Sequence, residues 1–147
     1  MNRAYAIAIA LLGIAFFGRV VAHIIQITMP VAFLPPLESF KGSELPDPVL
    51  LGAQIVILIL FVVVVRRIAA GSRVIALRWA YPTIVLGVIY FLVMTARLAL
   101  GLTILADDKW FAAPIPASFH LVLASAVILI GAYDRTHVAR ESAAHSP

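Results

Sequence analysis

Two arginines and two histidines stand inside long apolar segments of the sequence. Arg19 and His23 lie in the first such segment, Arg97 in the third and His120 in the fourth. An arginine at the middle of a membrane span costs about 2.5–3.5 kcal/mol on insertion scales, so a compensating interaction is needed to keep it there. These four residues are therefore the first candidates for a functional site.

The spacing of the polar residues places them on helical faces. Arg19, His23 and Gln26 stand at positions i, i+4 and i+7, which share one stripe along a helix. In the third segment Tyr90 and Arg97 belong to a series with alternating spacings of four and three residues, the pattern of a seam that faces other helices. We expect both arginines to point into the protein, and Tyr90 to pack in this seam.

All four residues are expected near one end of a bundle. Counting about 1.5 Å per residue from the nearer end of each segment puts the two arginines about 13–15 Å deep. The same count puts the two histidines about 7–9 Å deep, at nearly the same level. Two stripes compete for the inward face of the fourth segment: His120, Ala124, Val127 and Gly131, or Ser118, Ser125 and Ala132.

The first chemistry that suits these residues is the binding of a b-type haem. Two imidazoles on different helices can ligate one iron from opposite faces, while guanidinium groups bond the propionates. In this hypothesis His23 and His120 are the metal ligands. Arg19 and Arg97 bind the propionates, and Met94 is an alternative axial ligand. Such a protein would transfer electrons between the quinone pool and a periplasmic partner.

Two further hypotheses need no metal. Arg19 and Arg97 could bind the carboxylate or phosphate of an anionic lipophile, and Gln26 with a histidine could bond the oxygens of a quinone. Alternatively the chain is a non-catalytic accessory or assembly subunit, whose cluster meets a membrane-protein partner or a second copy of the chain. Gln54, in the second segment, is expected to make an interhelical hydrogen bond. Whether the chain is an enzyme stays open, because no Asp, Glu or Lys lies inside the predicted spans to act as a base.

The composition requires a lipid bilayer around these segments. Of the 147 residues, 63% are hydrophobic and 12% are charged, and the mean hydropathy is +1.07. A soluble domain carries roughly 25% charged residues. The chain has no cysteine, which excludes disulfides, thiolate metal sites and cysteine nucleophiles. The net charge of +4 comes from arginines that flank apolar segments, so we expect no nucleic-acid partner.

The expected fold is all-α, a four-helix transmembrane bundle in up-down-up-down order, forming a single integral membrane domain over residues 1–147. Backbone groups in hydrocarbon need internal partners, and a span needs about 20 mostly apolar residues. The predicted spans are residues 4–29, 49–65, 80–106 and 115–133. Their limits follow from prolines, which stand where helices begin or end.

Charge sorting predicts the orientation. The connection after the second span carries four arginines and no acid, which is typical of the cytoplasmic side. The other two connections carry acidic residues such as Glu44 and Asp107. We therefore expect both termini in the cytoplasm, the candidate site in the periplasmic half, and a multi-pass protein of a bacterial-type inner membrane. The apolar segment 31–40 is expected to fold over the outer mouth of the bundle.

Overall fold

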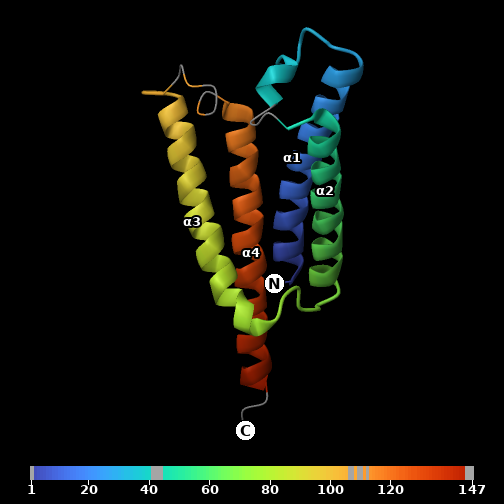
Figure 1. Ribbon diagram of the computed structural model, residues 1–147. Coiled ribbons are helices and arrows are strands. Elements are labelled where there is room, and N and C mark those ends of the chain that lie inside the picture. The colour runs from blue at the N-terminus through green and yellow to red at the C-terminus, as the bar shows by residue number, and fades with distance from the viewer. Residues whose placement is uncertain (1, 41–44, 106–107, 109–110, 112, 145–147) are drawn as a thin grey trace.

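Four long helices and one short 3-10 helix make up the computed structural model (Figure 1). They are α1 Asn2–Thr28, η1 Leu37–Phe40, α2 Asp47–Ala69, α3 Leu77–Gly101 and α4 Pro114–Ala144. The structure describes residues 2–40, 45–105, 108, 111 and 113–144, with side chains as far as residue 136. Within these residues, α1 to α4 are each long and apolar enough to cross a membrane, which confirms the predicted all-α, four-span fold. Glu44 and Asp107, used for the predicted orientation, lie outside the described residues.

The helices differ from the predicted spans at their ends. α2 continues through Arg66 and Arg67 to Ala69, because an arginine stem can continue a helix while its guanidinium reaches the membrane surface. α3 ends at Gly101 rather than at residue 106. The backbone of Phe111 fills the place where a side chain of residue 101 would be. α4 extends to Ala144, past the predicted end of the fourth span at residue 133.

The helices form two hairpins that meet at the centre of the molecule. α1 packs on α2, α3 packs closely along α4, and α1 also contacts α4. Figure 1 shows the helices in the order α3, α4, α1, α2, with the start of α1 and the end of α4 toward the same end. Because α4 has neighbours on two sides, its side chains between residues 119 and 134 are all buried or half-buried. That is why no single inward face stands out in its sequence.

The hydrophobic core lies where α1, α2 and α4 meet. Phe16 on α1 contacts the rings of Phe61 on α2 and Phe119 on α4, with centroids 6.1 and 6.3 Å away. Nearer the start of the chain, Tyr5 packs edge-on against Tyr133, at 5.7 Å. Only 11% of the α2 span and 17% of the α3 span are buried. The remaining apolar surface of these outer helices is therefore available to lipid.

Glycines bring α3 and α4 close together. A Cβ atom at Gly131 would lie 2.8 Å from the carbonyl oxygen of Ala80, and Gly87 approaches α4 with similar closeness. The stripe of α4 that contains Gly131 and His120 is therefore the one that faces α3. Ser118, from the competing stripe, is exposed.

A buried carboxylate anchors the connection between α2 and α3. Asp134 on α4 is fully buried, and its two oxygens accept hydrogen bonds from the backbone N–H groups of Val74 and Ile75, both at 3.0 Å. The hydroxyl of Tyr133 donates to the carbonyl of Ser72 at 3.2 Å. Asp134 stands one residue beyond the predicted fourth span, which ends at residue 133. Its pairing with backbone gives this acid a structural role.

The close approach of α3 and α4 makes a prediction about Gly131. We expect Gly131→Ala to destabilise the protein by about 1–3 kcal/mol, because the added methyl group meets backbone atoms of α3 that cannot move independently. Gly52→Ala is the matched control. It adds the same methyl group where no atom lies within 4 Å, and should be neutral or stabilising by about 0.5–1 kcal/mol. Thermal unfolding in detergent measures both, and equal midpoints for the two variants would contradict the close packing of α3 on α4.

Candidate functional site

Arg19 lies where α1, η1 and α4 meet, and only 8% of its surface is exposed. One terminal nitrogen, Nη2, donates a hydrogen bond of 3.1 Å to the carbonyl oxygen of Phe40. The guanidinium also lies 5.3 Å from the centre of the Phe119 ring. Both partners are electrically neutral, and Nε is buried with no hydrogen-bond partner among the described residues. The positive charge of Arg19 is therefore shielded from water and only partly satisfied.

The short helix η1 covers this end of the bundle. It contacts both α1 and α4, and Figure 1 shows it beside the ends of these helices. Phe40, its last residue, is 3% exposed and stacks on the imidazole of His23, with ring centroids 5.7 Å apart and planes inclined by 9°. The part of segment 31–40 that forms η1 covers the bundle end as predicted, whereas Phe33, earlier in the segment, is 82% exposed.

His23 is fully buried between α1 and its neighbours. Its Nδ1 lies 3.4 Å from Nε2 and 3.5 Å from Oε1 of Gln54 on α2. Gln54 is itself buried, and this contact confirms the interhelical hydrogen bond predicted for it. The His23 ring is thus oriented from two sides, by a side-chain amide and by an aromatic face.

Gln26 holds the connection that follows α1. Its Nε2, which carries two N–H groups, lies within hydrogen-bond distance of the carbonyl oxygens of Val31, Leu34 and Pro35, at 2.7–3.2 Å. Its Oε1 accepts a hydrogen bond of 3.1 Å from the backbone N–H of Val31. The side-chain amide of Gln26 is thus hydrogen-bonded to the backbone of residues 31–35. The structure therefore places Gln26 as a residue that positions η1.

A second group of polar residues lies between α3 and α4. The hydroxyl of Tyr90 and Nδ1 of His120 share a hydrogen bond, and their rings meet edge-to-face with centroids 5.9 Å apart. Arg97 is 4% exposed and stands two turns from Tyr90 on the same face of α3. Tyr90 lies in the seam as predicted, but it also has a polar role that packing alone does not describe. Met94, one turn from Arg97, is half-buried.

Arg19 lies at the junction of the two groups. Its guanidinium stands over the ring of Phe119, the residue before His120 in the chain. We call Arg19, Arg97 and His120 the Arg–His cluster. These residues come from α1, α3 and α4, respectively, so the cluster forms only when the two hairpins pack against each other. His23 stands one turn from Arg19 on α1, held by Gln54 and Phe40.

Arg19 is the member of the Arg–His cluster with an unsatisfied donor, because its Nε is buried with no hydrogen-bond partner among the described residues. A guanidinium group has donor nitrogens and no acceptor atom. Among the described residues, no three His, Asp or Glu side chains gather in a way that could hold a metal ion. Buried donors that carry positive charge are suited to a carboxylate or a phosphate, which accepts charge-assisted hydrogen bonds in pairs.

Phe40 and Phe119 contact Arg19, and the sequence did not predict either contact. Phe40 supplies a backbone carbonyl and a ring, and Phe119 supplies the aromatic face under Arg19. In the sequence Phe40 looks like a residue that anchors the membrane interface. The one available signal for Phe119 is its position directly before His120.

Comparisons with protein-family models, curated proteins and solved structures give no match to this chain. What the chain is follows from its four helices of membrane-spanning length and hydropathy. It is a small four-span integral membrane protein. Its function has to be inferred from the residues and their geometry.

Proposed function

We propose that this membrane protein binds the anionic group of a membrane-soluble ligand at the Arg–His cluster. The observation that carries the proposal is the environment of Arg19. Its guanidinium is buried, its partners are a neutral carbonyl and a neutral ring, and its Nε has no partner among the described residues. A carboxylate or phosphate oxygen would supply the acceptor that this donor lacks.

A purely structural role explains Arg19 less well. Replacing buried charged groups by apolar side chains of similar volume is often neutral or stabilising by about 1–4 kcal/mol, because the charge no longer has to be desolvated. Local rules are broken mainly at functional sites, where the gain is in function rather than in stability. The charge of Arg19 therefore favours a ligand that the bare fold does not need.

The position of the cluster indicates the class of ligand. Apolar helices surround it, and the outer surfaces of α2 and α3 are apolar as well. A ligand that reaches this place from the bilayer needs an apolar body as well as an anionic head. A long-chain carboxylic acid or a lipid phosphate has both properties.

Titration of the protein in lipid nanodiscs with oleate tests this proposal. We expect Arg19→Met to weaken oleate binding roughly 10- to 100-fold, since hydrogen bonds to a charged group are lost. The thermal unfolding midpoint of the ligand-free variant should not fall. Arg3→Met, which removes the same charge at the exposed start of α1, is the control and should bind like the wild type. Calorimetry measures the binding, and wild-type affinity combined with lowered stability in Arg19→Met would assign the residue a structural role.

The proposal includes an orientation. Arg66, Arg67, Arg73 and Arg78 cluster around the connection between α2 and α3. This connection lies beside the start of the chain, because a Cβ atom at Gly71 would stand 3.4 Å from Nδ2 of Asn2. Arginine-rich connections stay in the cytoplasm. We therefore place both termini in the cytoplasm and the Arg–His cluster in the periplasmic half of a bacterial-type inner membrane.

Thiol labelling checks the orientation directly, because the chain has no cysteine. Ser72 and Thr103 are exposed residues near opposite ends of the bundle. In intact spheroplasts, a membrane-impermeant maleimide should label Thr103→Cys and leave Ser72→Cys unlabelled until the membrane is opened. The reverse pattern would place the Arg–His cluster in the cytoplasmic half.

A second candidate function is the binding of b-type haem for electron transfer with the quinone pool. The observation that favours it is the same at both histidines: Nδ1 of His23 meets Gln54, and Nδ1 of His120 meets Tyr90. A metal-binding histidine is commonly oriented in this way through its second nitrogen. In this proposal the Nε2 atoms would ligate iron, with Arg19 and Arg97 toward the propionates. We place haem binding second because it requires the imidazoles of His23 and His120 to ligate the same iron, whereas anion binding requires only the guanidinium of Arg19.

An absorption spectrum of the isolated protein tests the haem proposal. A Soret band should be present in protein from haem-replete cells and should be lost in both His23→Ala and His120→Ala. Met94→Leu, which removes the alternative axial ligand, should keep the band if the two histidines are the ligands. Colourless wild-type protein would reject this proposal and leave the anion-binding proposal intact.

A further inference from the structure

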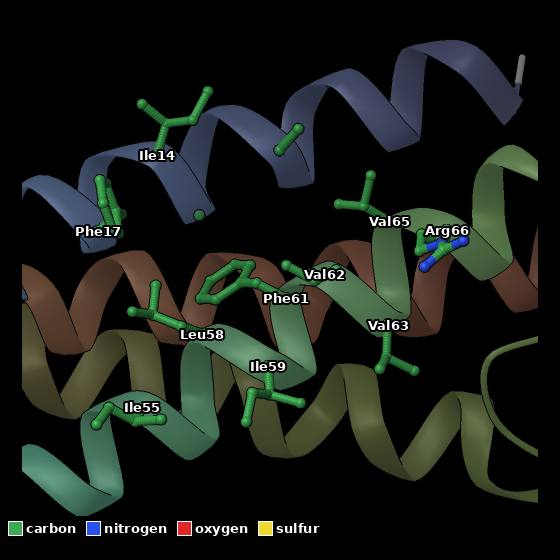
Figure 2. A pocket seen from close by; sticks show the side chains of 12 residues that line it. Ile14, Phe17, Ile55, Leu58, Ile59, Phe61, Val62, Val63, Val65 and Arg66 are labelled. Atoms are coloured by element: carbon green, nitrogen blue, oxygen red, sulfur yellow. The ribbon is translucent and has the colours of Figure 1, made fainter.

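An apolar groove runs along the face where α1 and α2 meet, with a volume of about 620 Å³. Figure 2 shows its lining, with Phe17 and Ile55 toward one end and Arg66 at the other. Every lining residue except Arg66 is apolar. The groove is thus long and apolar, with one positively charged side chain at its end.

Small residues on α1 make room for this groove. Ala10 and Gly13 line it, and a Cβ atom at Gly13 would stand 3.2 Å from the ring of Phe61, so the helices are close there. Larger side chains form the walls and stay more than half exposed, at 65% for Ile14 and 56% for Ile59. The groove therefore opens to the surroundings of the bundle, which for this face means lipid.

The length of the groove matches one leaflet of a bilayer. From Ile55 to Arg66, a rise of about 1.5 Å per residue gives a length of about 16 Å. Half of a hydrocarbon core of about 30 Å is about 15 Å. Arg66 stands in the last turn of α2, where a long basic side chain reaches the level of the lipid headgroups. The groove thus runs from mid-bundle to one membrane surface.

We propose that this groove binds one acyl chain of an anionic phospholipid, with the lipid phosphate bonded to Arg66. The apolar walls suit the chain, the length suits one leaflet, and the guanidinium suits the phosphate. Arg67 and Arg73 nearby make the same surface attractive to anionic headgroups. A second copy of the protein fits less well. In the same orientation it would bring its own Arg66 to the level of this one, and like charges would meet.

This site does not depend on the proposed function. It lies along α1 and α2 toward the arginine-rich connection, whereas the Arg–His cluster lies under η1 near the other end of α1. An Arg19→Met variant should bind phospholipid in the groove like the wild type. Failure of one proposal would therefore be visible without failure of the other.

Native mass spectrometry with added phosphatidylglycerol and phosphatidylcholine, in equal amounts, tests the groove. The wild type should retain phosphatidylglycerol in preference. Arg66→Gln should lower its affinity for phosphatidylglycerol about fivefold, to the level of phosphatidylcholine. Arg67→Gln is the matched control, because it removes the same charge one residue away without lining the groove, and it should keep most of the preference.

Larger side chains in the groove test the binding of the acyl chain separately from the binding of the headgroup. Ala10→Leu should lower the binding of both lipids. Ile59→Trp, at the exposed wall, makes the same test without touching the contact between the helices. Equal losses in Arg66→Gln and Arg67→Gln, or unchanged binding in both filled variants, would overturn the proposal. A protein dimer in the wild-type spectrum that disappears in the filled variants would show that a second copy occupies the groove.

Discussion

One buried positive charge lies where the α1–α2 and α3–α4 hairpins meet. Arg19 is held away from water at the junction of the two hairpins, with a carbonyl of η1 on one side and a ring of α4 on the other. Neither partner neutralises it. Because Arg19 contacts both η1 and α4, it lies where the packing of α1 on α4 meets the cover of the bundle end. The unsatisfied donor of Arg19 therefore leaves this end of the fold with a preference for an anion.

The buried charges at the two ends of the molecule, Asp134 and Arg19, differ in how fully they are hydrogen-bonded. Asp134 has both of its oxygens hydrogen-bonded to the backbone of the α2–α3 connection, which is a complete structural arrangement. Arg19 has a donor nitrogen that nothing among the described residues accepts from. The first arrangement stabilises a connection whose partners are all within the chain. The Nε of Arg19 needs an acceptor from outside the described residues. We therefore assign a structural role to the end with Asp134 and a binding role to the end with Arg19.

Much of this could be predicted from the sequence. Hydropathy and length predict the four helices, because a bilayer accepts few other structures, and the i, i+4, i+7 spacing predicts that Arg19 and His23 are buried together. The inward face of α4 could not be predicted, because α4 is covered on two sides. The roles of Phe40 and Asp134 were also hidden. A backbone carbonyl acts through the path of the chain rather than through its residue type, and an acid at the end of a span looks like part of a wet loop.

Binding of an anion by Arg19 requires direct contact between that anion and the guanidinium group. Solid-state NMR of the protein in lipid can measure dipolar coupling between the side-chain nitrogens of labelled arginine and the carboxyl carbon of labelled oleate. We expect strong coupling in the wild type, its loss in Arg19→Met, and no change in Arg3→Met. Bound oleate whose carboxyl group shows no coupling to arginine nitrogen would show that Arg19 does not bind the anion.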